Sequence, residues 1–260
     1  MNPWLAGVFA FPLTILAGGV WGALLTANLA TTPALPWAPL VMAVILWLAW
    51  RAVRRLPIRA NRVPAQQVTW ALIAGACSLG SLSGLWIVLF RTFRIAGNPV
   101  PDFSKYPLLS AILILAMASL VSSVSEETGF RGYFQSILES RVSPAAAISI
   151  QALVIAPGHG STQGFAWPTL LFYLLVDTML GTTAYLTNSI LPGIAIHAIG
   201  IAVFFTLIWP HDHERIPLAQ SGLDRWFWIH TAQAVVFGAL AIVAYARLAK
   251  LTRAKRSGSI

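Results

Sequence analysis

Charged residues are scarce in this sequence. Only 10% of its 260 residues are charged, whereas 57% are hydrophobic. A soluble globular protein carries about 25% charged residues, so the composition excludes an ordinary soluble enzyme and predicts an integral membrane protein. The lipid bilayer is therefore the first partner that we expect, and the length divides naturally into spans of about 20 residues each.

Acidic residues are especially few, because 8 of them accompany 17 lysines and arginines, for a net charge of +9. Ten basic residues form two clusters beside apolar segments: Arg51, Arg54, Arg55, Arg59 and Arg62, and then Arg247, Lys250, Arg253, Lys255 and Arg256. Such clusters are typical of the cytoplasmic ends of membrane spans. No aromatic or motif context accompanies the charge, so we expect no nucleic-acid partner.

Cysteine is nearly absent. The single residue, Cys77, excludes an intramolecular disulfide and a cysteine-rich metal site. The sequence also lacks HExxH and other helix-borne zinc spacings, so we expect no metal and no other cofactor. The N-terminus lacks the basic start and the cleavage site of a secretory signal, which predicts a retained first span.

Long apolar runs, by contrast, fill most of the sequence. They predict an all-α fold, a polytopic transmembrane helical bundle of about eight spans, and no repeat or linker divides residues 1–260 into more than one membrane domain. The expected spans cover residues 5–27, 36–50, 69–90, 107–125, 143–158, 168–187, 189–209 and 226–246. In the third span, Gly80 and Gly84 form a GxxxG that predicts close helix packing.

Eight spans place both termini on the same side of the membrane. The two basic clusters make that side the cytoplasm, and we expect the membrane to be a bacterial inner (plasma) membrane. The loops 28–35 and 159–167, which contain no lysine or arginine, then lie outside. The loop 91–106 is an exception, because it carries Arg91, Arg94 and Lys105 on the outer side.

A few ionisable residues lie within the spans, where each costs a few kcal/mol and is expected to face the bundle interior or a wet cavity. They are Glu126, Glu127 and Arg131 at the fourth span, His159 at the end of the fifth, Asp177 in the sixth and His197 in the seventh.

Helical geometry separates the two glutamates. Glu127 and Arg131 are four residues apart and can pair on one face, whereas Glu126 is rotated by about 100°. One carboxylate is then neutralised while the other points elsewhere. Gly129 and Gly132 let another backbone or a substrate approach this helix closely. The plainest interpretation is an ion-paired helix end.

The histidines admit two kinds of interpretation. Taken alone, His197 is a buried side chain that donates to a backbone carbonyl, and His159 is a neutral loop residue. Taken with Glu126, they can activate a water and stabilise an oxyanion. The same three side chains can also bind Zn²⁺ with an open fourth position. We expect Asp177 to cap or bridge within the bundle and assign it no chemistry.

The string EETGFRG, residues 126–132, resembles the EExxFRG signature of the CPBP family of intramembrane proteases, which includes CAAX-prenyl-protease and bacteriocin-processing relatives and is also called Abi. The histidine that ends ALVIAPGH takes the place of the family's FxxxH, with Ile155 where phenylalanine is usual. The stretch GTTAYLTNSILPGIAIHA, residues 181–198, resembles the family's third region. The similarity covers about residues 107–209.

The resemblance implies a helical membrane protease whose site opens toward the cytoplasmic half. It implies that Glu126 and His159 activate a water, that Glu127 and Arg131 support the site, and that His197 stabilises the oxyanion. The family's asparagine one turn after the second histidine is here Ile201, which donates nothing. The predicted span limits also place His159 and Glu126 at opposite depths, so one boundary must be wrong if they meet.

We therefore expect an intramembrane endopeptidase that hydrolyses peptide bonds of membrane-associated protein or peptide substrates, without metal. A zinc peptidase that uses Glu126, His159 and His197 is its mechanistic alternative. A non-catalytic immunity or scaffold protein on the same fold is suggested by Ile201. A proton-coupled carrier is a third class, although the sequence shows neither an inverted repeat nor paired broken helices.

Overall fold

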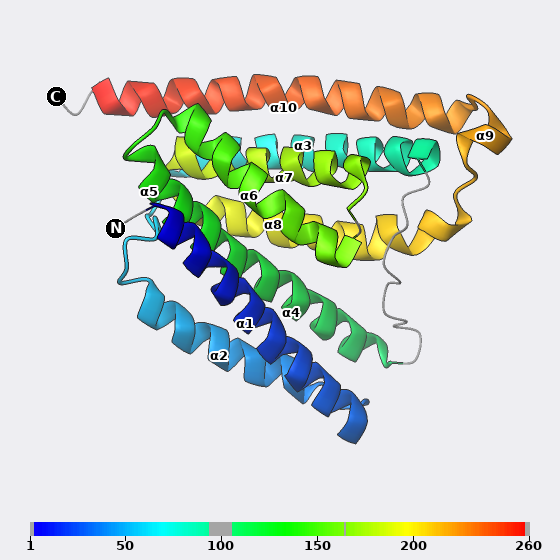
Figure 1. Ribbon diagram of the computed structural model, residues 1–260, viewed down its shortest axis with the longest axis horizontal. Coiled ribbons are helices and arrows are strands. Elements are labelled where there is room, and N and C mark those ends of the chain that lie inside the picture. Colours follow the sequence, from blue (N-terminus) through cyan, green and yellow to red (C-terminus); the bar gives the residue numbers. More distant parts are fainter. Residues whose placement is uncertain (1–2, 94–105, 164, 258–260) are drawn as a thin grey trace.

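The computed structural model describes residues 3–93, 106–163 and 165–257, and within these ranges the fold is all-α with no strand (Figure 1). Its helices are α1 (Pro3–Thr31), α2 (Trp37–Val53), α3 (Ala65–Phe93), α4 (Leu108–Glu126), η2 (Glu127–Gln135), α5 (Ser136–Glu139), α6 (Pro144–Gln163), α7 (Trp167–Thr187), α8 (Leu191–Val203), η3 (Phe204–Ile208), η4 (Trp209–Glu214), α9 (Leu218–Ser221) and α10 (Arg225–Ser257). Segments η2 and η3 are π-helical, and η4 is a 3₁₀-helix.

Each of the eight apolar stretches of the sequence contains a helix. Within the described ranges, six segments are long and apolar enough to cross a membrane: Ala10–Thr31, Ala65–Phe93, Leu108–Glu139, Trp167–Thr187, Leu191–Asp212 and Arg225–Ala254. Helix α2 is apolar but shorter, at 17 residues. Successive long helices alternate in direction along the bundle (Figure 1), as a polytopic membrane protein requires.

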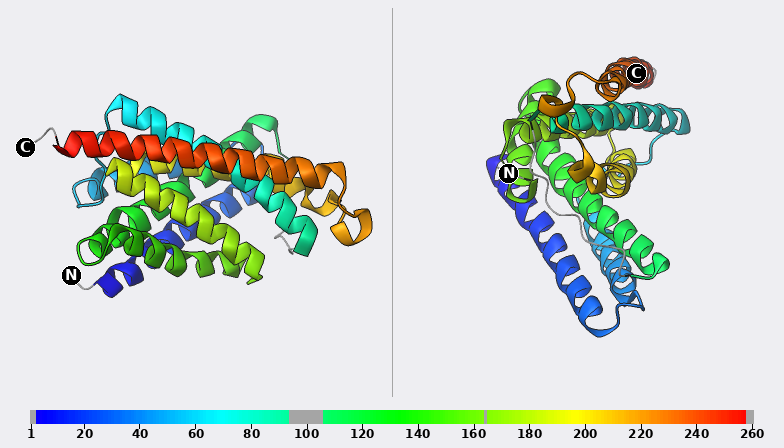
Figure 2. Two further views of the ribbon diagram at one scale, coloured as in Figure 1. Left: turned by 90° about the horizontal axis from the view of Figure 1, so that it is seen from above. Right: turned by 90° about the vertical axis from the view of Figure 1, so that its right-hand side faces the viewer.

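Helices α3 and α10 form the most extensive helix pair and lie side by side along one edge of the bundle (Figures 1 and 2). The GxxxG of Gly80 and Gly84 lies in this interface, where a Cβ on Gly84 would stand 2.7 Å from the His230 carbonyl oxygen. Nearby, the Ser81 hydroxyl donates to the Ala234 carbonyl at 2.7 Å. The predicted close packing is therefore confirmed, since only small residues let the two backbones approach this far.

Helices α1, α2 and α4 diverge from the layer of α3 and α10 (Figure 2, right). Buried apolar side chains join these three helices, among them Trp21, Met42 and Met117. A second core, built around Trp86 and Phe172, joins α3 to α7, α8 and η3. The ionisable residues of the spans lie between these two cores, where α4 and η2 pack against α7 and α8.

The connection between α2 and α3 carries four of the five arginines of the first cluster and is bonded to two other elements. Arg59, whose φ is 56°, donates to both carboxylate oxygens of Glu139 at the end of α5. Its carbonyl accepts a hydrogen bond from the Ile190 N–H, just before α8, at 3.0 Å. Helix α1 begins and α10 ends at this same end of the bundle (Figures 1 and 2). That this end faces the cytoplasm stays a prediction.

Glycine allows η2 to pack closely against its neighbours. A Cβ on Gly132 would lie 2.5 Å from the carbonyl oxygen of Ile58, and one on Gly129 would lie 3.3 Å from that of Ala10 in α1. The expectation that these glycines admit another backbone is confirmed, and the backbones belong to α1 and to the α2–α3 connection. The π-helical turns that carry them are a feature common at functional sites.

Gly132→Ala should lower the free energy of unfolding by about 1–3 kcal/mol, because the added methyl group meets a backbone oxygen that cannot rotate away. The matched control is Gly19→Ala in α1, where an added Cβ meets nothing within 4 Å. Alanine has the better helix propensity, so the control should be neutral or stabilising. Thermal unfolding in detergent measures both, and equal midpoints would contradict the close packing of η2.

Arg91, which the sequence placed at the start of a loop, lies in the last turn of α3 and is buried. Its side chain is 6% exposed, and both terminal nitrogens donate to Asp224, at 2.9 and 2.8 Å. It also donates to the Ser221 hydroxyl at 2.8 Å. These bonds attach α3 to the segment that precedes α10. The other two basic residues of the loop, Arg94 and Lys105, lie outside the described residues.

This ion pair makes stability depend on pH in the acid range. The pKa of Asp224 falls from 3.8 to about 2, because the Arg91 guanidinium and the Phe227 N–H donate to its carboxylate. A lowered folded-state pKa adds stability above about pH 4, and this contribution is lost as the pH falls toward about 2. In Asp224→Asn the contribution is missing, so the gap in unfolding midpoint between wild type and variant should close over this window. A gap that stays constant would refute the assignment.

Candidate active site

Glu126 and Glu127 lie within a long helix rather than at the end of a span. Helix α4 ends at Glu126 but continues directly into η2 and α5, so that Leu108–Glu139 is one candidate span. The helix therefore continues past residue 125, where the apolar run of the fourth span ends. The polar residues of η2 end the apolar run, but the helix continues through them. Hydropathy detects where the apolar run ends and not where the helix ends.

The longer helix also removes the conflict in depth between Glu126 and His159. His159 lies within α6, which passes the internal Pro157 and continues to Gln163. Glu126 lies close enough to His159 and His197 to interact electrostatically with both side chains. Helices α4, α6 and α8 thus bring one carboxylate and two imidazoles together, as a water-activating site requires.

Glu127 is fully buried and contacts two other site residues. Its Oε1 lies 3.3 Å from Nη1 of Arg131 and 3.1 Å from Nδ1 of His197. Its Oε2 lies against α8, where a Cβ on Gly193 would stand 2.7 Å away. A carboxylate paired with arginine only accepts hydrogen bonds, so Nδ1 of His197 carries the hydrogen and donates it to Glu127. Glu127 therefore orients the His197 ring.

Arg131 is neutralised by a second carboxylate, Asp177, which the sequence predicted to cap or bridge within the bundle without identifying its partner. Asp177 of α7 is 1% exposed and accepts a hydrogen bond from Nη2 of Arg131. Arg131 thus joins Glu127 on its own helix to Asp177 on another, and all three side chains are buried. Burying such ions costs several kcal/mol each unless they are paired. The one signal in the sequence was an aspartate inside a span.

Glu126 has a more open environment than Glu127. Its side chain is 14% exposed, whereas that of Glu127 is 0% exposed. Oε1 accepts a hydrogen bond from the Ser122 hydroxyl, one turn earlier, at 2.6 Å. Oε2 faces Nε2 of His197 at 3.9 Å, beyond hydrogen-bond length. Ser122 was not identified from the sequence, because serine four residues before a glutamate is common on helices.

An aromatic ring fixes His159 from one side. The Tyr173 ring of α7 stacks on the imidazole with 3.9 Å between ring centroids and 7° between planes. Tyr173 itself is buried. The imidazole is therefore held parallel to a buried aromatic ring of α7.

A small cavity of about 60 Å³ adjoins His197. Most of its lining is apolar, from α3, α7 and α8, and only His197, Tyr173 and Trp209 contribute an N–H or O–H donor. Ile201 is part of the lining, one turn after His197. The position where the CPBP pattern has asparagine thus faces the same cavity as His197, but with a side chain that has no donor.

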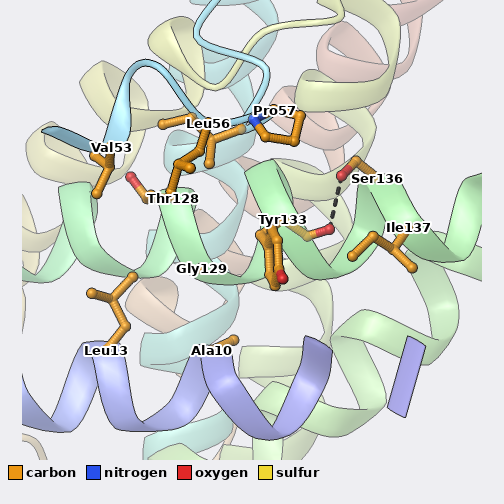
Figure 3. A pocket seen from close by; sticks show the side chains of 11 residues that line it. Ala10, Leu13, Val53, Leu56, Pro57, Thr128, Gly129, Tyr133, Ser136 and Ile137 are labelled. Carbon is orange, nitrogen blue, oxygen red and sulfur yellow. Dashed lines mark hydrogen bonds between the residues drawn. The ribbon is translucent and has the colours of Figure 1, made fainter. Parts of the chain in front are cut away.

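A larger cavity of about 610 Å³ lies on another face of η2, between α1 and the α2–α3 connection (Figure 3). Leu13 projects into it from α1, and Leu56 and Pro57 cover it from the opposite side (Figure 3). Thr128, the residue after Glu127, is part of the lining, and its hydroxyl has no hydrogen-bond partner among the described residues. An apolar lining of this kind favours a hydrocarbon group over a charged one.

The zinc alternative that the sequence left open stays a prediction. Within the part of the chain that the structure describes, no group of three or more His, Cys, Asp or Glu side chains is arranged to hold a metal ion. We therefore derive no step through a metal.

Residues 108–203 match the family model described as type II CAAX prenyl endopeptidase Rce1-like. This segment runs from the start of α4 to the end of α8, and it contains Glu126, His159 and His197. The resemblance to the CPBP family that the sequence predicted is thereby confirmed. No curated protein and no solved structure matches the chain.

Asp177→Ala should lower the free energy of unfolding by about 3–5 kcal/mol, because it removes one partner of a buried ion pair. Asp177→Asn, which keeps a hydrogen-bond acceptor for Arg131, should cost less. Thr178→Ala is the matched control, since Thr178 is exposed on the same helix and such changes stay within about 0.5 kcal/mol. The readout is the unfolding midpoint in detergent. If Asp177→Ala proved as mild as Thr178→Ala, Asp177 would not be the partner that neutralises Arg131.

Proposed function

We propose that this protein is an intramembrane endopeptidase that hydrolyses peptide bonds of membrane-associated proteins or peptides with a glutamate-activated water. The observation that carries the proposal is the difference between the two adjacent glutamates. Glu127 is paired with Arg131 and His197 and is fully buried. Glu126 is partly exposed and lies near two imidazoles. The family match supports the reaction class.

In this mechanism Glu126 is the general base. With Oε1 held by Ser122, Oε2 accepts a proton from a water that attacks the scissile carbonyl carbon. The C–N bond then breaks, and the same proton passes from Glu126 to the leaving nitrogen. His159 shares in orienting the water, and the stacked Tyr173 ring keeps its imidazole in place. Each peptide bond that is hydrolysed consumes one water, and the mechanism uses no cofactor.

His197 stabilises the negative oxygen of the tetrahedral intermediate. Its Nδ1–H is directed to Glu127, so Nε2 is the nitrogen that faces the reacting groups. Nε2 donates to the oxyanion when the ring is an imidazolium. Glu127, Arg131 and Asp177 have a positioning role, because they fix the His197 ring and the helix that carries Glu126.

A non-catalytic immunity or scaffold protein is the second candidate, and Ile201 is the observation that favours it. An oxyanion site with one donor fewer is slower by about 10²–10³ where this has been measured by substitution. The matching family is described as prenyl endopeptidases, so prenylated protein ends belong among the substrates to be tested. Peptides without a lipid group belong there equally.

The decisive comparison uses the purified protein in lipid vesicles, mixed with a membrane proteome, followed by mass spectrometry of new peptide termini. Wild type should produce termini that Glu126→Gln does not, with a loss of about 10²–10⁴ in rate, because the glutamine cannot accept the proton. Glu139→Gln is the control. It makes the same change in α5 of the same long helix, where the carboxylate pairs with Arg59 instead.

Identical sets of termini from wild type and Glu126→Gln would overturn the protease assignment and favour the non-catalytic protein. Loss of termini in Glu139→Gln as well would point to a folding defect rather than to chemistry, so the unfolding midpoint of each variant is measured alongside. A chelator added to wild type tests the zinc alternative, because only a metal-dependent enzyme would lose turnover.

A further inference from the structure

The proposed oxyanion site is short of hydrogen-bond donors. A tetrahedral intermediate gains most from donors that already point at the position of its negative oxygen. A neutral His197 ring has one N–H, and that N–H is directed to Glu127 at 3.1 Å. Ile201, one turn later, has none. With His197 as an imidazolium the oxyanion has one donor, and with His197 neutral it has none, so a donor from another helix strengthens the site in either state.

Tyr173 of α7 carries a hydroxyl in the required region. It lines the cavity that His197 and Ile201 also line, and it stacks on His159. Tyr173 therefore contacts His159 and lines the same cavity as His197 and Ile201.

The stacking also makes Tyr173 rigid. The 7° angle between the rings and the 3.9 Å between their centroids leave the phenol little freedom to rotate away. Phe172 packs edge-on against Tyr173 at 5.4 Å between centroids. A donor held in this way pays little reorganisation cost during the reaction, which is the condition under which oxyanion donors are effective.

Trp209 is the other neutral donor in the cavity lining, and its location is less favourable. Its ring packs on Phe204, Phe205 and Trp86, the aromatic cluster at the α8–η4 end of the cavity, rather than on a histidine. Its N–H is buried without a hydrogen-bond partner among the described residues. Trp209 therefore supplies a control rather than a second candidate.

We propose that the Tyr173 hydroxyl donates a hydrogen bond to the oxyanion and thereby replaces the donor that Ile201 lacks. This inference rests on the proposed peptidase function and adds a catalytic residue to it. The hydroxyl keeps its proton throughout, so no bond to Tyr173 forms or breaks. Its contribution is to lower the energy of the transition state, not to bind the substrate.

The test uses a fluorogenic peptide that carries a cleavage sequence found in the termini experiment, with the full-length protein in lipid vesicles. Tyr173→Phe keeps the stacked ring and removes only the hydroxyl, so kcat should fall by about 10²–10³ while KM changes little. Ile201→Asn in the Tyr173→Phe background should restore kcat by at least about tenfold, because it returns a donor to the same cavity. Trp209→Phe should leave kcat within about threefold of wild type.

The outcomes separate this inference from the function on which it rests. If wild type cleaves in a Glu126-dependent way and Tyr173→Phe is equally fast, the peptidase stands and the role of Tyr173 is refuted. If Tyr173→Phe is slow but Ile201→Asn does not rescue it, the hydroxyl acts through His159 and not on the oxyanion, which also refutes the proposal. If wild type shows no Glu126-dependent cleavage, both fail together.

Discussion

A single buried guanidinium organises the interior of this protein. Arg131 lies between Glu127 and Asp177, with none of its side chain exposed, and each carboxylate comes from a different helix. Because an unpaired charge in this position would cost several kcal/mol, the pairing fixes the relative position of η2 and α7. Glu127 extends the cluster to His197 and so to α8. The geometry of the candidate site is thus a consequence of how one positive charge is neutralised away from water.

The same cluster explains why two adjacent glutamates have different environments. Rotation along the helix turns Glu127 into the charged interior, where Arg131 and His197 use its first oxygen. Glu126 is turned toward the two imidazoles and keeps some exposure. The pair therefore combines a carboxylate that is held in a buried ion pair with one that is partly exposed, as the proposed proton transfer requires. A single glutamate could not both neutralise Arg131 and accept a proton from water, because pairing with arginine lowers the basicity that water activation requires.

Sequence reasoning located what depends on local spacing. The eight helices follow from apolar runs, and the pairing of Glu127 with Arg131 follows from a separation of four residues. It missed what depends on tertiary contact. The sequence did not identify Arg131 as the partner of Asp177, because the two residues are 46 positions apart. It also did not distinguish Tyr173 from any other aromatic residue in an apolar span. The apolar run of the fourth span ends near residue 125 although the helix continues to Glu139, because polar residues that face one another inside a bundle lower the hydropathy without ending a helix.

The cost of the cluster bears on whether the protein is an enzyme. Buried ion pairs can often be replaced by apolar residues of similar volume with no loss of stability, and sometimes with a gain. A scaffold that needed only to span the membrane would be served as well by leucine and phenylalanine at these positions. Three carboxylates, a guanidinium and two imidazoles instead converge on one place within the spans. The energetic cost of burying these groups is accounted for if the site transfers a proton. In such a site the hydroxyl of Tyr173, which lines the same cavity as Ile201, would supply the hydrogen-bond donor that isoleucine lacks.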